Sequence, residues 1–462
     1  MSIIVPISSF KNEHIKKLNN DLHIKPIQKQ STSRFNQNFS QSIKPIEAFD
    51  TFKLNNVDVA CLPFSYFYHH FEHLDSFKSN RISFSQDKTN LEFCGSLLER
   101  QKLVRDEIFE ILNRTKSVVL SLHTGFGKTV LALYIAYKIN LKTVILCHRK
   151  IIIQQWVESI KKYLPNATYA ILNESVKKKD RKEFPNWVNE DENPNFLICN
   201  VINVPKKDRM FYSSYGLVVV DEIHTVCTNS FSKSLLFIYP KYLIGLSATP
   251  FRSDGLDRIL EIFVGPEIVY RKLFKPFNVY KINTLYKPET SLNISGNLDW
   301  NSILEGQSTN KRRNQLIVNL CRFFCNRNIL VLVKRIEHAN TLSSMLKVYG
   351  EDVDTFCGNN KVANYNCRIL IASYSIAGVG FDHPGLNMLI GAADVQEQFM
   401  QYIGRIFRRD DVSPIYIDMV DENSTIKKHS TSRIKICKEI GATIKDFHKT
   451  FPHFQQLVDL LN

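Results

Sequence analysis

The sequence feature that most constrains the fold is an alternation of short β-rich runs with amphipathic helical runs, which begins near Leu97. Strands that are joined through a helix run parallel, because the crossover brings the chain back to the same end of the sheet. The clearest unit consists of the buried-strand run Ser117–Leu122, a glycine-rich turn and the helical run Thr129–Ile139. The alternation stops near Arg271 and predicts a parallel α/β domain at 96–271. Its further elements are expected at Thr143–Cys147, Ile151–Tyr163, Asn195–Cys199, Tyr215–Val220 and Leu243–Ser247.

The same alternation resumes farther along the chain and predicts a second parallel α/β domain at 313–425. The stretch between the two domains, 272–312, is irregular and polar, so we expect it to be a linker. The tail at 426–462 is basic and is expected to be helical. The predicted elements of the second domain are strands at Asn328–Val333, Arg368–Ala372, Asn387–Gly391 and Ile415–Met419, and helices at Ile336–Val348 and Gln396–Arg408.

Residues 1–95 differ in composition from the rest of the chain, and we expect them to form an accessory region. Asn, Gln, Ser, Phe and His are frequent, the first glycine is Gly95, and apolar periodicity is weak. The polar stretch Gln28–Ser42 is expected to be a loose arm. Aromatic residues are dense between Phe64 and Phe71, and a small core is favoured there over a surface that stacks on nucleic-acid bases.

The charge balance points to a polyanionic partner. The chain has 60 Lys and Arg against 45 Asp and Glu, a net charge of +15, which favours nucleic acid or an acidic membrane surface. No apolar run approaches the roughly 20 residues of a membrane span, and no basic region precedes the apolar N-terminus, so neither a membrane segment nor a signal peptide is expected. None of the ten cysteines forms a CxxC pair, so we expect no zinc site and reduced thiols.

The run His123-Thr124-Gly125-Phe126-Gly127-Lys128-Thr129 joins a predicted strand to a predicted helix, which is the context of a phosphate-binding loop. The glycines allow backbone N–H groups to turn toward phosphates, and the start of the helix adds its positive end. Lys128 is expected to reach the β- and γ-phosphates of ATP, and Thr129 to offer a hydroxyl to Mg²⁺. The strict motif has Gly at the position of Leu122, so a chance match in a turn is the alternative.

A second motif follows a buried strand and argues against a chance match of the loop. Gly216–Val220 runs into Asp221-Glu222-Ile223-His224. A carboxylate at the end of a parallel strand beside a phosphate-binding loop is placed to hold Mg²⁺, and this is Asp221. Glu222 can orient and deprotonate the attacking water. His224 is too far along to bind phosphate, and we expect it to couple to other motifs.

Ser247-Ala248-Thr249-Pro250 follows the next predicted strand, and with it the chain resembles the superfamily 2 helicases over about residues 97–410, in family order. The resemblance implies two tandem RecA-like domains, ATP hydrolysis with Mg²⁺, and nucleic acid as the partner. It also implies that Ser247 and Thr249 link hydrolysis to domain closure. Ile223 departs mildly from the DEAD and DEAH forms of the family.

Three further stretches fit the same family. Leu98-Glu99-Arg100-Gln101 resembles the upstream glutamine motif, which implies that Gln101 reads adenine. Gln154-Gln155-Trp156 resembles motif Ia, whose helix borders the nucleic-acid groove. Ser375–Asp382 resembles motif V and implies that Asp382 contacts the nucleotide, although Val379 stands where the family often has Glu.

The strongest single match is Gln401-Tyr402-Ile403-Gly404-Arg405-Ile406-Phe407-Arg408, which resembles motif VI, QxxGRxxR. Arginines three residues apart lie on one face of a helix, so we expect a helix to present Arg405 and Arg408 together. A guanidinium on the γ-phosphate spreads the charge that develops in phosphoryl transfer. We assign that role to Arg408 with Arg405 beside it, although the order could be reversed, and count Gln401 as a coupling residue.

The expected contacts to nucleic acid are sequence-independent contacts to phosphates, because no base-reading motif lies in the groove that the family uses. The candidates lie beside motif Ia, beside Ser247–Pro250 and beside motif V. They are His148, Arg149, Lys150, Arg252 and Ser373.

Other stretches suggest a branch of the superfamily. Phe251–Gly255 resembles duplex-DNA translocases related to the helicase subunit of the transcription-and-repair factor. Asp21–Pro26, Lys311–Ile317 and Ile329–His338 resemble the transcript-release helicases of poxviruses and their asfarvirus and iridovirus counterparts. This group implies a DNA-dependent ATPase of 3′ to 5′ polarity with a role in the release of nascent transcripts. We therefore expect a DNA helicase or translocase that acts in viral transcription or in repair, with DNA and a transcription complex with RNA polymerase as partners. The expected place is the virion or the infected cell's cytoplasm or nucleus.

Two alternatives stay open at this point. The chain could be an RNA helicase, which stimulation of its ATPase by RNA but not by DNA would indicate. It could instead be a motor subunit or a non-enzymatic scaffold in a larger nucleic-acid-processing complex. The intact residues Lys128, Asp221, Glu222 and Arg405 argue against the scaffold.

Overall fold

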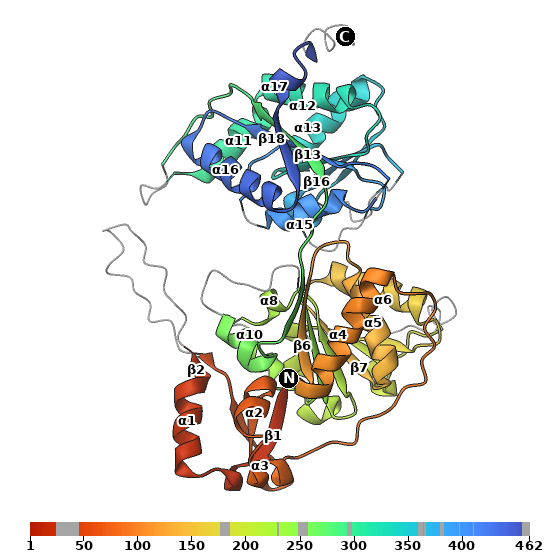
Figure 1. The fold of residues 1–462 in the computed structure, drawn as a ribbon, viewed down its shortest axis with the longest axis vertical. Helices are drawn as coiled ribbons and strands as arrows, with labels where there is room; N and C mark the ends of the chain where they lie inside the picture. Colours follow the sequence, from red (N-terminus) through yellow and green to blue (C-terminus); the bar gives the residue numbers. More distant parts are fainter. Residues whose placement is uncertain are drawn as a thin grey trace. The chain divides into compact units, whose positions relative to one another are not determined.

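The chain forms two compact units, Met1–Arg271 and Lys272–Asn462, in the computed structural model (Figure 1). The division falls where the predicted first domain ends. The structure describes residues 1–24, 46–175, 185–228, 231–247, 257–292, 298–358, 364, 366–378, 383–396, 398–409 and 411–454. The expected arm at Gln28–Ser42 lies outside these residues.

The first unit is built on a seven-stranded parallel sheet of order β12-β6-β11-β10-β7-β9-β8. Aliphatic residues fill its central strands, and these strands are buried throughout, as parallel strands covered on both faces require. The two strands at the edges of this sheet, β12 and β8, were not predicted. The strands are β6 (Ser117–Leu122), β7 (Thr143–Cys147), β8 (Tyr169–Ile171), β9 (Phe196–Asn200), β10 (Leu217–Val220), β11 (Tyr242–Ser247) and β12 (Ile268–Arg271).

Helices cover both faces of this sheet. On one side lie α4 (Glu99–Thr115), α5 (Lys128–Ile139) and α6 (Lys150–Tyr163), and on the other side α8 (Ile223–Val226) and α10 (Asp257–Phe263) (Figure 1). The strands that precede α5, α6 and α8 all end at the same edge of the sheet, because all run parallel. The loops at this edge carry the motifs.

The N-terminal region adds a three-stranded antiparallel sheet of order β1-β5-β4. Its elements are β1 (Ser2–Pro6), α1 (Asn12–Leu22), β2 (His23–Ile24), β3 (Ile46–Glu47), β4 (Asp50–Leu54), β5 (Val57–Pro63), α2 (Phe64–His70) and α3 (Asp75–Asn80). In the predicted aromatic patch, Phe64, Phe67 and Phe71 are buried. Buried rings are not available to stack on bases, so the interpretation as a core is confirmed.

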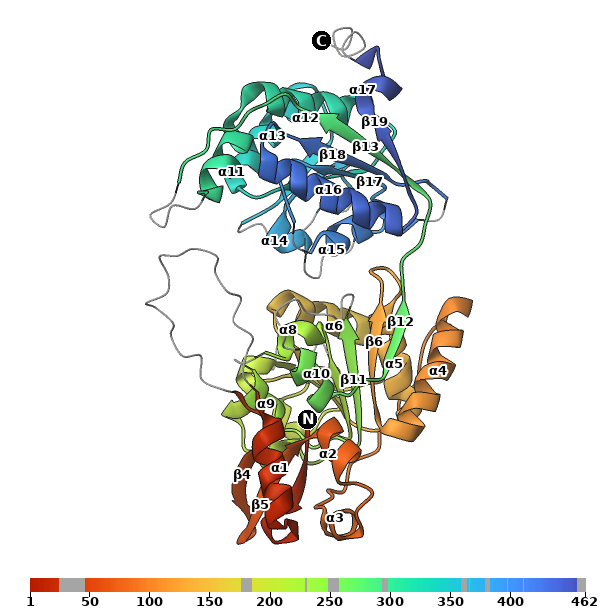
Figure 2. The same ribbon diagram turned by 60° about the vertical axis from the view of Figure 1, so that its left-hand side comes forward.

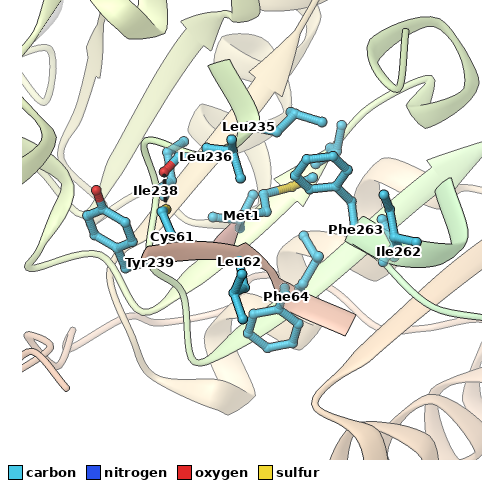
Figure 3. Packing of buried hydrophobic residues seen from close by; sticks show 14 of the residues in the cluster. Met1, Cys61, Leu62, Phe64, Leu235, Leu236, Ile238, Tyr239, Ile262 and Phe263 are labelled. Carbon is cyan, nitrogen blue, oxygen red and sulfur yellow. Dashed lines mark hydrogen bonds between the residues drawn. The ribbon is translucent and has the colours of Figure 1, made fainter. Parts of the chain in front are cut away.

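This N-terminal core is continuous with that of the first unit. Figure 3 shows Met1, Leu62 and Phe64 packed near Leu236 and Phe263. A backbone hydrogen bond also connects the two parts: the Ser2 amide donates to the Ile238 carbonyl at 3.0 Å. The region called accessory on composition therefore shares one hydrophobic core with the first α/β domain.

The second unit holds another seven-stranded parallel sheet, of order β15-β16-β14-β17-β18-β13-β19 (Figure 2). The protein thus consists of two tandem RecA-like domains with a C-terminal helical segment. The elements are β13 (Phe277–Asn283), α11 (Trp300–Thr309), α12 (Lys311–Phe323), β14 (Ile329–Val333), α13 (Ile336–Val348), β15 (Val353–Phe356), β16 (Ile369–Ser373), α14 (Tyr374–Ala377), β17 (Met388–Gly391), α15 (Phe399–Ile403), β18 (Ile415–Val420), α16 (Ser424–Glu439), β19 (Ala442–Asp446) and α17 (Phe447–Thr450).

Two stretches differ from expectation. The expected linker 272–312 contributes β13, which lies inside the sheet between β18 and β19. The expected helical tail 426–462 contributes β19 to the same sheet, although α16 is a helix as predicted. Both strands mix polar residues, lysine among them, with apolar ones, so neither forms the continuous apolar run that marks the central strands of these sheets.

Two further observations concern the whole described chain. No helix among the described residues has both the length and the hydropathy to span a membrane. All ten cysteines lie within the described residues, none of them forms a disulfide there, and eight of them are buried.

Candidate functional site

The loop between β6 and α5 has a backbone that only glycine adopts easily. Gly125 has φ +87° and Gly127 has φ +92°, both in the left-handed region. A Cβ on Gly127 would lie 2.4 Å from Nε2 of Gln101, which no side chain could tolerate without a shift. Between the two glycines, the Phe126 side chain is buried and anchors the loop. The loop therefore curls in front of the N-terminus of the twelve-residue helix α5, as a phosphate-binding loop does.

Lys128 and Leu122 explain how the loop departs from the strict motif. The Lys128 ammonium donates to the backbone carbonyl of Leu122 at 2.9 Å. The Leu122 side chain is fully buried in the core. The position is thus the last residue of a buried strand and contributes its carbonyl oxygen, so a leucine side chain fits there. Thr129 follows on the first turn of α5, partly exposed.

Gln101 ties α4 to this loop. Its amide donates to the Phe126 carbonyl at 2.9 Å, and its oxygen accepts from the Leu98 amide at 2.9 Å. The side chain is buried, and both ends of its amide are bonded to backbone. Reading of adenine by Gln101 stays a prediction. On the outer side of the loop, the Arg100 guanidinium lies over the Phe126 ring at 5.7 Å, and the His123 ring contacts the same ring edge-on.

The acidic pair stands at the end of β10. Oδ1 of Asp221 accepts from the Glu222 amide at 2.9 Å, and Oδ2 accepts from Nε1 of Trp156, also at 2.9 Å. Burial, and next the Glu222 carboxylate, raise the pKa of Asp221 to about 6, while the Trp156 hydrogen bond and the Lys128 ammonium act in the opposite direction. Glu222 has φ +48°, a left-handed turn that starts α8.

The donor set suits Mg²⁺. Thr129 and Asp221 offer a hydroxyl and a carboxylate, the hard oxygen ligands that Mg²⁺ prefers. Within the ranges that the structure describes, no group of three or more His, Cys, Asp or Glu side chains could hold a metal by itself. Mg²⁺ commonly takes one or two protein oxygens and completes its shell with water and substrate phosphates, so these two residues fit the ion.

His224 links the acidic motif to the next strand. Its Nδ1 lies 2.9 Å from the hydroxyl of Ser247, the last residue of β11, and 3.5 Å from the Glu222 carboxylate. His224, which we expected to couple to other motifs, thus has a direct hydrogen bond to Ser247. The other expected residue of that motif, Thr249, lies outside the described residues.

The candidates for nucleic-acid contact are dispersed. His148 Nδ1 lies 3.1 Å from the Thr225 hydroxyl, which itself donates to the Glu222 carbonyl. Burial, and next Arg149, lower the pKa of His148 to about 4, so the ring is neutral at pH 7 and offers phosphate no charge. Arg149 and Lys150 are exposed at the start of α6, and Arg252 lies outside the described residues.

Motif VI in the second unit is not one continuous helix. The helix α15 ends at Ile403, and a 3-10 turn follows at Gly404–Ile406, so Arg408 lies beyond both. The expectation that one helical face presents both arginines is therefore wrong. Arg405 is buried, and its Nε donates to the Ala377 carbonyl at 3.0 Å, while Arg408 is partly exposed. Gln401 is buried on α15.

Near motif VI, Ser373 is buried at the end of β16, with its hydroxyl 3.0 Å from that of Ser375. Ser373 therefore offers little surface to a nucleic-acid strand. Asp382, expected to contact the nucleotide, lies outside the described residues.

Sequence reasoning missed a buried ion-pair network that holds the segment leading into α15. Arg433 on α16 donates to Asp394 at 2.7 Å, to Asp418 at 2.8 Å and to the Val395 carbonyl at 2.7 Å. Arg313 on α12 pairs with Asp421 and also donates to the Ala392 carbonyl. In the sequence, Arg433 is one of several basic residues of α16. Its burial in the structure distinguishes it from the lysines of the same helix.

Trp156 is the second residue that was missed. The motif Ia match placed its helix at the nucleic-acid groove, yet its indole is buried and bonded to Asp221. A buried tryptophan usually needs a hydrogen-bond partner for its N–H. This need is the one sequence signal that could have pointed to a polar partner of Trp156.

The chain is similar to several known proteins. The profile of the family described as "Type III restriction enzyme, res subunit" matches residues 88–252. "Putative helicase 161L" of Invertebrate iridescent virus 6 is 39% identical over 377 residues, which cover 77% of this chain and 84% of that protein. "Putative ATP-dependent RNA helicase L396" of Acanthamoeba polyphaga mimivirus is 28% identical over 371 residues, 74% of this chain and 68% of that protein.

The fold has solved counterparts. The structure titled "S. cerevisiae Dbp5 bound to RNA and ADP BeF3" has a TM-score of 0.52 and 12% identity, and the match covers 78% of this chain and 93% of that one. Fold, site and relatives together define the class: the chain belongs to the superfamily 2 helicases. Within that class, both of the relatives named above come from large DNA viruses.

Proposed function

We propose that this helicase is a DNA-dependent ATPase that translocates on or unwinds DNA and acts in viral transcription, at the release of transcripts. One observation carries the ATPase part: Lys128, the Asp221–Glu222 pair and the His224–Ser247 hydrogen bond all belong to the carboxyl edge of one parallel sheet. This edge is where α/β sheets bind their ligands.

Each residue at that edge has a role in the proposed hydrolysis. Lys128 exchanges its bond to the Leu122 carbonyl for the β- and γ-phosphates, which are stronger acceptors because they are charged. Thr129 and Asp221 would hold Mg²⁺, which when bound supplies positive charge to the phosphates. Glu222 accepts the proton of the attacking water. The resemblance adds Gln101 and Asp382 as nucleotide contacts.

In the second unit, we assign the γ-phosphate contact to Arg408 and an internal role to Arg405. Arg405 is buried and bonded to the Ala377 carbonyl within its own unit, whereas Arg408 is partly exposed and beyond the helix. A guanidinium that meets phosphate must be free to leave its intramolecular surroundings, which favours Arg408. Gln401 and Thr249 remain proposed coupling residues.

The nucleic-acid contacts of the proposed function rest on Arg149, Lys150 and Arg252. Arg149 and Lys150 are exposed cations at the start of α6, in the stretch that resembles motif Ia. Contacts of this kind neutralise phosphates and do not read sequence, so binding should weaken steeply with salt.

RNA is the second candidate substrate, since the mimivirus relative is named an ATP-dependent RNA helicase. The test measures ATP hydrolysis with single-stranded DNA, duplex DNA and RNA as activators, with Lys128→Ala as the inactive reference. Stimulation by DNA supports the proposal. Stimulation by RNA alone would replace it with the RNA helicase, and hydrolysis by Lys128→Ala equal to that of the wild type would refute the assigned site.

A further inference from the structure

Trp156 connects two βα units that the sequence separates. It lies on α6, which follows β7, while Asp221 follows β10, the neighbouring strand in the sheet. The Trp156 indole is 1% exposed, and its N–H donates to Oδ2 of Asp221 at 2.9 Å. The contact spans 65 positions of the sequence.

The Asp221 carboxylate is held at both oxygens. The Glu222 amide donates to Oδ1 and the Trp156 indole to Oδ2, so rotation of the carboxylate breaks at least one of the two hydrogen bonds. A carboxylate has about four lone-pair positions, which leaves others open toward water or a cation. The indole is rigid and packed in the core, so it fixes the direction of its own N–H.

We propose that Trp156 is a positioning residue that orients the Asp221 carboxylate for Mg²⁺, which makes motif Ia part of the ATP site as well as of the nucleic-acid side. This inference rests on the proposed function for its purpose, but the hydrogen bond itself can be tested without nucleotide. Partners that orient a metal ligand in this way typically contribute about 10-fold or more in metal affinity.

The first experiment uses the nucleotide-free full-length protein with ¹⁵N-labelled tryptophan. The chain has three tryptophans, so three indole N–H resonances are expected, and Trp187→Phe and Trp300→Phe identify the resonance of Trp156 by elimination. Asp221→Asn should move the Trp156 resonance and leave the other two in place. An unmoved Trp156 resonance would overturn the proposal, whether or not the protein hydrolyses ATP.

The second experiment measures binding of fluorescent ADP as a function of Mg²⁺. Trp156→Phe keeps the ring and removes the donor, so the Mg²⁺ concentration for half-maximal effect should rise about 10-fold, with ADP affinity in EDTA unchanged. Trp187→Phe is the matched control, an indole of the same unit that stacks on Tyr169 at the edge strand β8. In the Asp221→Asn background, Trp156→Phe should add nothing.

Three outcomes contradict the proposal in this assay: an unchanged Mg²⁺ dependence, an equal loss of ADP affinity with and without Mg²⁺, or full additivity with Asp221→Asn. If Trp156→Phe fails to fold, the Trp156 indole resonance in Asp221→Asn still tests the hydrogen bond, because that variant keeps the tryptophan. If the wild-type protein has no ATPase activity but Asp221→Asn still shifts the Trp156 resonance, the proposed function is refuted. The Trp156–Asp221 hydrogen bond is then still supported.

Discussion

Arg433→Met should destabilise the second unit strongly, because it breaks a buried ion-pair network from its centre. The Arg433 side chain is 3% exposed, and it pairs with Asp394 and Asp418, which are 2% and 0% exposed. Methionine roughly fills the volume but leaves two buried carboxylates without their cation. Loss of one partner of a buried pair costs about 3–5 kcal/mol.

The remaining partners limit the damage without removing it. The hydroxyls of Tyr416 and Ser430 still donate to Asp418, and His429 still contacts Asp394. We therefore expect the lower half of that range, about 3 kcal/mol, which corresponds to a fall of roughly 6–12 °C in the melting temperature for a unit of this size.

The control is Arg409→Met. Arg409 is also an ion-paired arginine of the second unit, but it and its partner Asp411 are 40% and 63% exposed. Exposed pairs contribute little to stability, because water and salt screen them. Unfolding of the second unit can be followed by fluorescence of Trp300 after Trp187 and Trp156 are replaced by phenylalanine. Equal midpoints for Arg433→Met and Arg409→Met would refute the reasoning.

Four further outcomes are expected. Lys128→Ala should lower the ATPase rate at least about 100-fold, whereas Lys138→Ala, at the far end of the same helix, should not; equal rates in a phosphate-release assay would contradict this. Gly127→Ala should lower the melting temperature, and it should lower it by less in a Gln101→Ala background, because the added Cβ would collide with that amide; additive effects would exclude the collision. Ser247→Ala should retain ATP hydrolysis but lose strand separation, measured on the same fluorescent duplex, since it removes the hydroxyl bonded to His224. The pKa of His148 is lowered from 6.5 to about 4, so its neutral form stabilises the fold above pH 6.5, and that contribution is lost as the pH falls toward 4; His148→Gln should flatten this part of the stability curve in urea titrations, and an unchanged slope would count against it.

Much of the fold was predictable because buried parallel strands have a strong local signal. Runs such as Val118–Leu120 and Val218–Val220 are apolar on both faces of the strand, so they identify themselves without knowledge of their neighbours. The strands β13 and β19 interrupt their apolar residues with polar ones and so lack a continuous apolar run; their place in the sheet is set by pairing with distant strands. The N-terminal region was separated on composition, although its core is continuous with the first domain.

The candidate site divides in the same way. Spacing along the chain predicted Lys128, Asp221 and Glu222 as site residues, because a loop, a strand end and a helix start are local features. The prediction of a single helix for motif VI was wrong. The helix α15 ends at Ile403, a 3-10 turn follows at Gly404–Ile406, and Arg408 lies after both. Local sequence could not give the partners of Arg433 and Trp156, because each bonds to a residue on another element of the fold.

The sequence by itself determined the class of this protein: two parallel α/β domains, a phosphate-binding loop, an acidic strand end and a helicase order of motifs. The tertiary structure decided which groups touch. It showed the His224–Ser247 and Trp156–Asp221 hydrogen bonds, the amide of Gln101 that locks the loop, and the arginine network before motif VI. The physical reason is that hydrophobic periodicity and glycine placement are encoded locally, whereas a hydrogen bond depends on where the sheet brings distant segments together.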